Sequence, residues 1–404
     1  MAVSTLPVSI PDLGRTPAAS AAPHHPAVHV SFQERALRAV GGASTGAKAY
    51  WRGVLEHGPR SFAPNLETQA GWIEFESGDG CPVTVQDGPC GNSYPASLLT
   101  QYIDYPRAEL DLVKSGAARL ATRIGLAGFE ALLRLAQSDR AVQWNSWLMS
   151  TNVPPQGLIR ATQSVTAELL RRFPSHAILL KNVDPTESAD WIPTLRDSGY
   201  DLVTSRQVYH FDGKAAGYWG KSTVKRDLKE FAADPRFTWC THEEISVTEA
   251  LRITQLYSQL YLEKHSQLNP QYTERFVRSA LRERWLEFHG LRDQAGTLVG
   301  IFGFFTLGGT TTVPFIGYDT SLPQEAGLYR RLFAGILRLI AERKQHLNYS
   351  SGAGDFKVRR GGVPVIEFNA LRYDHLPIHR RTAFRLAGAL VNRYVRPWLE
   401  NHSH

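Results

Sequence analysis

The sequence has few cysteines, no long hydrophobic run and no dense cluster of basic residues. Its three cysteines, Cys81, Cys90 and Cys240, form no CxxC pair and leave one unmatched, so we expect a reducing cytoplasm and no disulfide framework. Without an apolar stretch of about 18 residues, no transmembrane helix or integral membrane contact is expected. The absence of a run of about five or six basic residues argues against a surface that binds duplex DNA.

The composition is that of an ordinary globular protein. Hydrophobic residues make up 43% of the 404 residues and charged residues 21%, which is enough apolar mass for a sizeable core. A chain of this length corresponds to two domains of roughly 150 residues or more each. The formal net charge of +7 favours anionic partners, such as a phosphorylated cofactor or a nucleic acid.

The order of elements predicts an α/β (α+β) protein made of two similar halves. Residues 1–30 are rich in Ala, Pro, Ser and His, lack the apolar core of a signal peptide, and are expected to be disordered. An N-terminal domain is predicted over 31–212, a C-terminal domain over 213–380 and a final amphipathic helix over 381–404. Each half contains strands, a long helix, a short strand and a crossover.

Hydrophobic spacing also predicts several individual elements. Residues 108–137 have helical spacing, with a break expected at the glycines between 125 and 128, and a short strand is expected at 147–150. Two strands joined by the pair Gly308-Gly309 form a predicted hairpin, because consecutive glycines suit a two-residue turn. A long helix is predicted over 327–345.

The entrance of that helix is a candidate anion site. Gly327 follows Gln324 and precedes the helix, so free backbone N–H groups and the helix dipole could face a phosphate, with Arg330 adding charge. The alternative is a glycine used only to turn the chain into a core helix. Farther along, the small residues of 350–354 precede Lys357 and Arg359, which offer a point charge and a planar fork for phosphate or carboxylate. A solvated surface loop is the alternative there.

These motifs carry a family resemblance. Gly317-Tyr318-Asp319, the helix opened by Gly327, and the segment Phe356-Lys357-Val358-Arg359-Arg360-Gly361 occur in the order found in CelD/BcsL-like and Fem-type acyltransferases of the GNAT superfamily, which the chain resembles. The basic helix at Lys221–Leu228 is similar to the start of their second half. The resemblance, which covers roughly residues 221–377, implies two tandem GNAT-like folds that share one cleft. It also implies an acyl donor held as a coenzyme A thioester or as an aminoacyl-tRNA.

Candidate catalytic residues follow from the reaction that the resemblance implies. An attacking amine must lose a proton and the tetrahedral oxyanion must be stabilised, so His265 and Asp319 are candidate bases and Tyr318 a candidate acid or hydrogen-bond donor. Each has a structural alternative: a helix cap for His265, a loop opening for Asp319 and core packing for Tyr318. Positioning alone can also supply much of the rate.

We therefore expect an N-acyltransferase that moves an acyl group from acyl-CoA or a similar thioester to a small-molecule or peptide amine. The alternatives are a Fem-type transferase that uses aminoacyl-tRNA on a cell-wall precursor, and a non-catalytic GNAT-like module that binds a ligand. The second is favoured by Tyr329, which stands where the family's donor-binding pattern has a small residue. No metal is expected, because the closely spaced His375 and His379 have no third ligand nearby.

Overall fold

The computed structural model describes residues 27–41, 46–88, 93–110, 115–155, 157–187, 189–215, 217–232 and 234–401. Most of the segment predicted to be disordered, residues 1–30, lies outside this range, although strand β1 begins at Val28. Cys90 also lies outside it. Among the described residues, no helix combines the length and the apolar character needed to cross a membrane.

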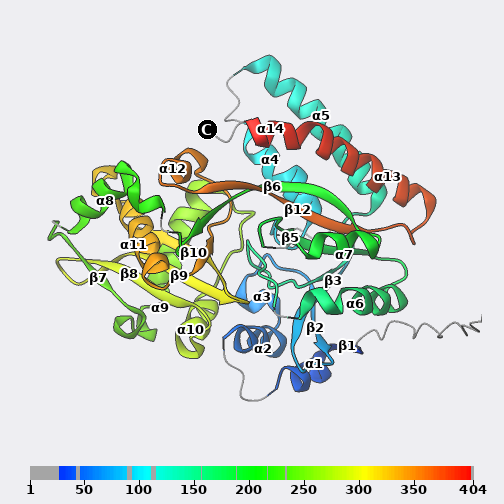
Figure 1. Cartoon of the computed structure of the whole chain (residues 1–404), viewed down its shortest axis with the longest axis horizontal. Helices are drawn as coiled ribbons and strands as arrows, with labels where there is room; N and C mark the ends of the chain where they lie inside the picture. Colours follow the sequence, from blue (N-terminus) through cyan, green and yellow to red (C-terminus); the bar gives the residue numbers. More distant parts are fainter. Residues whose placement is uncertain are drawn as a thin grey trace, which may run out of the picture.

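Within the described residues, twelve strands form one mixed sheet. The strand order is β1-β2-β3-β4-β5-β12-β6-β11-β10-β9-β8-β7, so the sheet runs without a break through both halves of the molecule (Figure 1). The strands are β1 (Val28–Phe32), β2 (Gln69–Phe75), β3 (Gly80–Asp87), β4 (Arg140–Trp144), β5 (Ala177–Val183), β6 (Asp201–Asp212), β7 (Phe237–Cys240), β8 (Glu287–Asp293), β9 (Leu298–Leu307), β10 (Thr310–Tyr318), β11 (His346–Asn348) and β12 (Val363–Arg372).

The two halves are joined by an exchange of strands at the centre of the sheet. Strand β12, late in the sequence, inserts between β5 and β6 and pairs antiparallel with both. Strand β6, the last strand of the first half, pairs on its other side with β11. The predicted domain boundaries of 31–212 and 213–380 stay a prediction, because the sheet itself is continuous across them.

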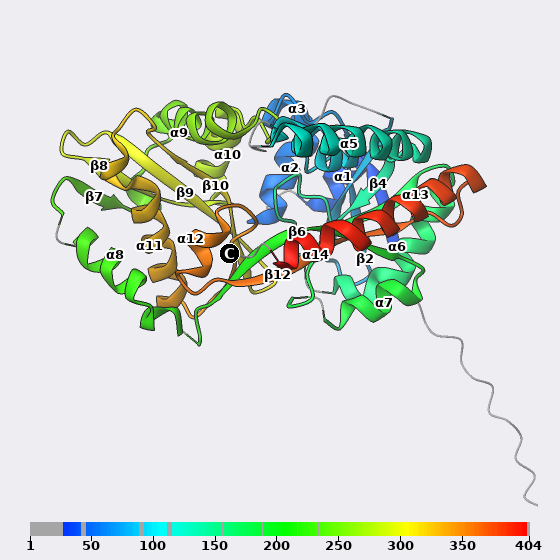
Figure 2. The same ribbon diagram turned by 90° about the horizontal axis from the view of Figure 1, so that it is seen from above.

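Helices cover both faces of this sheet (Figure 2). In the second half, α11 is buried along most of its length, with Leu328, Leu332, Phe333, Ile336 and Ile340 among its buried residues, while Arg338 is exposed. The α-helices are α1 (Gln33–Val40), α2 (Ala47–His57), α3 (Pro59–Phe62), α4 (Tyr105–Ala108), α5 (Gly116–Ala136), α6 (Leu158–Arg172), α7 (Trp191–Asp197), α8 (Ser222–Ala232), α9 (Ala250–Tyr257), α10 (Glu274–Glu283), α11 (Leu328–Glu342), α12 (Gly354–Val358), α13 (Ile378–Leu390) and α14 (Arg396–Asn401).

In the part of the chain that the structure describes, three π-helical segments extend these helices. They are η1 (Thr100–Asp104) before α4, η6 (Ser258–His265) after α9 and η8 (Val391–Val395) between α13 and α14. The chain is therefore helical from Ile378 to Asn401, and α13 packs beside α5 in both views (Figures 1 and 2). The first two π-helical segments both contribute side chains to the pocket described below.

Two local expectations are wrong. Helix α5 runs unbroken through Gly125 and Gly128, because single glycines weaken a helix by only about 1 kcal/mol each. The segment 147–150 is irregular, because the strand ends at Trp144 and both Asn145 and Leu148 adopt left-handed backbone angles that a strand cannot contain. The expected hairpin at Gly308-Gly309 is confirmed, since both glycines have positive φ and join β9 to β10.

The short pairing between β10 and β11 leaves room for the site described below. Strands β10 and β11 are parallel neighbours, but they pair only from Thr310 to Thr312. A bulge then follows between Thr312 and Phe315 in the pairing of β10 with β9. Beyond it, β10 continues to Tyr318 while β11 ends at Asn348, so the two strands part. Within the described residues, no strand pairs with this stretch of β10 on its β11 side.

Candidate functional site

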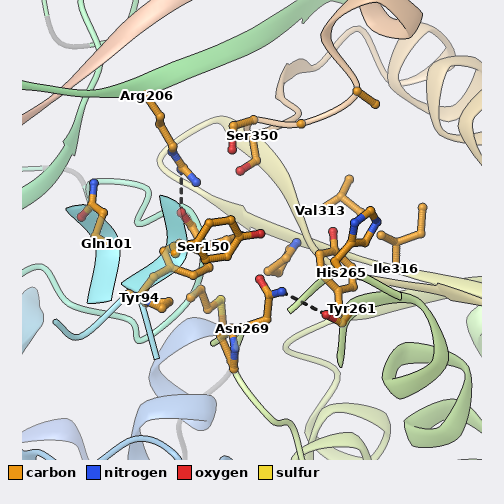
Figure 3. Close-up of a pocket in the computed structure, with 18 of the residues that line it drawn as sticks. Tyr94, Gln101, Ser150, Arg206, Tyr261, His265, Asn269, Val313, Ile316 and Ser350 are labelled. Carbon is orange, nitrogen blue, oxygen red and sulfur yellow. Dashed lines mark hydrogen bonds between the residues drawn. The ribbon is translucent and has the colours of Figure 1, made fainter. Parts of the chain in front are cut away.

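A cavity of about 580 Å³ opens where β10 and β11 separate. One wall comes from β10 through Val313, Pro314 and Ile316, and the opposite wall from the loop after β11, which includes Ser350 (Figure 3). The first half contributes Arg206 of β6 and other residues, and η6 of the second half lines the pocket as well, with Tyr261 and His265 among its residues. The pocket is therefore built jointly by both halves, at the place where their shared sheet is open.

Tyrosine side chains dominate the lining of this pocket. The tyrosines that line it are Tyr94, Tyr105, Tyr257, Tyr261, Tyr272, Tyr318, Tyr329 and Tyr349. Burial raises the pKa of Tyr329 to about 12, so this phenol stays protonated at neutral pH and can donate a hydrogen bond. Such rings combine apolar faces with a few polar atoms, which suits an amphipathic ligand.

A polar network occupies one end of the pocket. Arg206 Nε lies 2.7 Å from Oε2 of the fully buried Glu367, and Arg206 Nη2 lies 2.6 Å from the carbonyl oxygen of Ser150 (Figure 3). Asn182 donates to the same Glu367 oxygen at 2.8 Å. Because these partners come from β5, β6 and β12, the network fixes the exchanged strands relative to each other at the pocket floor.

Lys181 is a buried amine that also lines the pocket. It belongs to β5, where it interrupts an otherwise apolar run, and its Nζ donates to the carbonyl of Tyr94 at 2.7 Å. Burial lowers the pKa of Lys181 to about 7, although the charge of Asp139 opposes that shift. At neutral pH the amine is therefore divided between its charged form and a neutral form that can accept a proton.

The loop after β11 is held by Lys357. Its Nζ donates to the backbone carbonyls of Tyr349 at 2.8 Å, Ser350 at 3.2 Å and Ser351 at 2.9 Å, while burial lowers the pKa of this amine. The same nitrogen lies 4.5 Å from the centre of the Tyr349 ring and is almost completely buried. Lys357 thus fixes the wall that faces β10.

The three predicted catalytic residues fall at different places. His265 and Tyr318 both line the pocket, and the Tyr318 hydroxyl accepts a hydrogen bond from Lys264 Nζ at 3.1 Å. Partial burial, together with the charge of Lys264, lowers the pKa of His265, so its imidazole is neutral at pH 7. Asp319 is not among the lining residues. Burial acts against its ionisation, but hydrogen bonds from Ser321 and Arg252 outweigh this and lower its pKa, which makes it a weak base.

Of the five predicted donor-binding residues, only Lys357 lines the pocket. Gln324 is exposed, and Gly327 has the left-handed φ of 62° that lets it open α11. The guanidinium of Arg330 pairs with two carboxylates of α8, with Nη2 3.0 Å from Glu230 Oε2 and Nη1 3.7 Å from Asp227 Oδ1. Arg359 is exposed, with Asp355 at 4.0 Å. Their roles in donor binding stay predictions.

Sequence reasoning missed Lys181, Arg206 and Glu367. The sequence could have indicated Lys181, because this lysine directly follows the apolar run Ala-Ile-Leu-Leu of a predicted strand. Lysine is rarely buried, because moving its charge out of water is costly. Nothing in the sequence indicates Arg206 and Glu367, since their pairing depends on the insertion of β12 beside β6.

Comparisons with known proteins agree with this geometry in the second half. Residues 220–359 match a family described as an acetyltransferase (GNAT) domain, and this range contains β10, β11 and the loop of Lys357. No curated protein sequence matches the chain significantly.

Three solved structures are among those similar to this chain. L-PGS from Bacillus licheniformis has 14% identity and a TM-score of 0.41 over 57% of this chain and 78% of its own. FemX has 9% identity and a TM-score of 0.42, over 56% of this chain and 78% of its own. A probable N-acyltransferase from Enterococcus faecalis has 10% identity and a TM-score of 0.33 over 87% and 73%.

Proposed function

We propose that this protein is an N-acyltransferase whose donor carbonyl lies between β10 and β11, and the match of residues 220–359 to an acetyltransferase (GNAT) domain supports this proposal. The acceptor amine enters from the tyrosine-lined side of the pocket. The observation that carries the proposal is the unpaired β11 side of β10 beyond Thr312, which opens directly into the cavity. Backbone N–H groups left without a strand partner at such an edge can bind a carbonyl oxygen and stabilise the oxyanion.

Lys181 and His265 are the two groups that we propose for proton removal from the acceptor. Burial also lowers the pKa of Lys357, but its Nζ already donates to three backbone carbonyls. Lys181 and His265 both line the pocket, and each has a pKa shifted towards or below neutrality. In the reaction the amine nitrogen attacks the acyl carbon, and one of these groups takes the amine proton. The carbon–sulfur bond of a thioester donor then breaks, and the departing sulfur receives a proton. We propose Lys181 as the principal base, because its depressed pKa is combined with almost complete burial.

The donor is proposed to be acyl-CoA or a similar thioester, and an aminoacyl-tRNA is the second candidate. Arg330, beside the start of α11, is engaged by Asp227 and Glu230 of α8, so we do not assign it to the phosphate of either donor. Lys264 is exposed, lines the pocket and offers a cation to the phosphate-bearing part of either donor. The location of the protein in the cytoplasm stays a prediction.

The acceptor is proposed to be a small-molecule or peptide amine with an apolar portion. Tyrosine faces attract a protonated amine and also pack against hydrocarbon, so they can hold the acceptor before its proton is removed. The volume of about 580 Å³ accommodates an acceptor of moderate size beside an acyl group.

The test is transfer from a panel of acyl-CoA donors to a panel of amines, with products identified by mass spectrometry. A parallel arm supplies aminoacyl-tRNA, with and without RNase. A thioester donor predicts product that is insensitive to RNase, and a tRNA donor predicts product that RNase abolishes. If a folded sample binds ligands in the pocket but transfers nothing from either donor, a non-catalytic binding module replaces the proposal.

A further inference from the structure

Three metal-ligating side chains that the proposed reaction does not use converge where the two halves of the sheet meet. They are Glu187, His210 and His346, and one ligand atom of each lies within 4.8 Å of the others. His210 Nδ1 is 2.7 Å from His346 Nε2, and Glu187 Oε1 is 3.8 Å and 3.7 Å from these two nitrogens. The contact between the two histidine nitrogens is a hydrogen bond, so one of them carries a proton, and a metal ion at this point would take the place of that proton.

The strand pairing explains how distant residues meet. In the antiparallel pair β6–β11, His210 lies opposite Asn348 and His346 lies opposite Asp212, so the two histidines are diagonal neighbours on one face. Glu187 arrives from the turn that follows β5. Because the three residues are dispersed over 187–346, their sequence spacing resembles no metal-binding motif.

Two further observations indicate a ligand at this point. Oxygen Oε1 of Glu187 is buried and has no hydrogen-bond partner, and its side chain is only 10% exposed. On the far side of the cluster, Nε2 of His210 lies 2.5 Å from Oδ2 of Asp184. If Nε2 donates its proton to this carboxylate, the lone pair on Nδ1 faces the cluster. Metal-binding histidines commonly donate their other ring N–H to a carboxylate in this way.

We propose that Glu187, His210 and His346 form a binding site for a divalent transition metal ion of the Zn²⁺ type. Two imidazole nitrogens and one carboxylate oxygen are donors that such an ion prefers, and three protein ligands leave a position for water. Tetrahedral bonds of about 2.0–2.1 Å place ligand atoms about 3.4 Å apart. The imidazole nitrogens must therefore separate slightly and the carboxylate oxygen must move inward slightly.

The metal ion would connect the two halves of the protein and stiffen one wall of the pocket. His210 belongs to β6 of the first half and His346 to β11 of the second, so a shared ion links these strands. Asn348, next to the cluster, accepts a hydrogen bond from the backbone N–H of Ser350 at 3.0 Å, and Ser350 lines the pocket. The site is thus positioned to stabilise the fold rather than to contact substrate.

The experiment uses the full chain, freed of metal with a chelator and then titrated with Co²⁺ or Zn²⁺. The proposal predicts one tight equivalent, a visible cobalt absorption band, and a melting temperature that rises with Zn²⁺ concentration. Glu187→Gln, which preserves size, should abolish the tight equivalent. Asp184→Asn should weaken binding by about tenfold to a hundredfold, the usual effect of losing the group behind a ligand.

Glu287→Gln is the matched control, because Glu287 is also paired with a histidine but lies outside the cluster: its Oε1 is 2.8 Å from Nε2 of His289. It should leave metal binding unchanged. The proposal is overturned if the Glu187→Gln chain binds as much metal as the unaltered chain, or if the control loses binding equally. Should Glu187→Gln fail to fold, the unaltered chain decides alone: neither a cobalt band nor a Zn²⁺-dependent rise in melting temperature means no site.

Discussion

Arg360 and Asp227 form a buried ion pair, with Arg360 Nη2 2.7 Å and Nε 2.8 Å from the same carboxylate oxygen. The two residues belong to different motifs of the sequence, one in α8 and the other directly after α12. The guanidinium of Arg360 also stacks 3.6 Å from the centre of the Phe356 ring. This pair anchors α12, and with it Lys357, to the body of the second half.

Replacing Arg360 with methionine should strongly destabilise the protein, whereas replacing Arg359 should not. Arg360→Met leaves the buried carboxylate of Asp227 without its main partner. We expect the free energy of unfolding to fall by roughly 3 kcal/mol, at the lower end of the range for broken buried ion pairs, because Arg330 remains near Asp227. Arg359→Met changes an exposed side chain and should stay within about 0.5 kcal/mol. Urea unfolding of both variants measures the difference, and equal effects would contradict the assignment of Arg360 as the anchor.

Lys357→Met should disturb the wall of the pocket that faces β10. It removes the donor shared by the carbonyls of Tyr349, Ser350 and Ser351, so the loop they form should become mobile. We expect kcat/KM to fall by roughly tenfold to a hundredfold through misplacement of the wall. Hydrogen exchange should rise in residues 349–353. Lys225→Met, an exposed change on α8, is the control and should alter neither quantity.

The pH dependence of kcat/KM should follow the ionisation of Lys181. With a pKa of about 7 in the folded chain, this amine becomes a competent base as pH rises through 7, so kcat/KM should rise there. Lys181→Met should remove that rise along with most activity. A pH profile that keeps the same midpoint in the variant would move the role of base to His265.

Lys181 should also affect stability with a defined sign. Between its folded pKa of about 7 and the ordinary value of about 10.4, the unfolded chain binds the proton and the folded chain does not. Stability therefore rises with pH in this window, by up to about 1.4 kcal/mol per pH unit from this group. Urea unfolding at several pH values should show a smaller slope in Lys181→Met. An unchanged slope would mean that Lys181 remains protonated when buried.

Enlarging Val313 should obstruct the space between β10 and β11. Val313→Phe adds bulk to a residue of β10 that lines the pocket, and we expect the KM for the donor to rise, with longer acyl chains affected more. The exposed substitution Val363→Phe is the control and should leave KM unchanged. If Val313→Phe raises only the KM of the amine, the positions proposed for donor and acceptor are reversed.

The sequence predicted local structure and the second half of the fold well. Apolar periodicity indicated the helix at 327–345, found as α11, and Gly308-Gly309 indicated the hairpin. It did not indicate the insertion of β12 between β5 and β6, because strand order depends on long-range pairing that local patterns do not encode.

The same limit applies to the pocket. His265, Tyr318 and Lys357 were identified from the second half of the sequence and do line it. Lys181 and Arg206 were not identified, because they meet these residues only after the first half has packed against the second. Lys357 was expected to face a donor phosphate, and its nitrogen instead holds three carbonyls of the loop. A charged residue in a motif therefore indicated an important place without indicating what it contacts.

The proposed position of the donor can be seen in a structure of the protein with a non-hydrolysable acyl thioester analogue. We expect the analogue's carbonyl oxygen within about 3 Å of the backbone N–H of Val313 or of a residue in 315–318, on the side of β10 that β11 leaves unpaired, since Pro314 has no N–H. An analogue bound outside the gap between β10 and β11, with that gap still empty, would contradict this proposal.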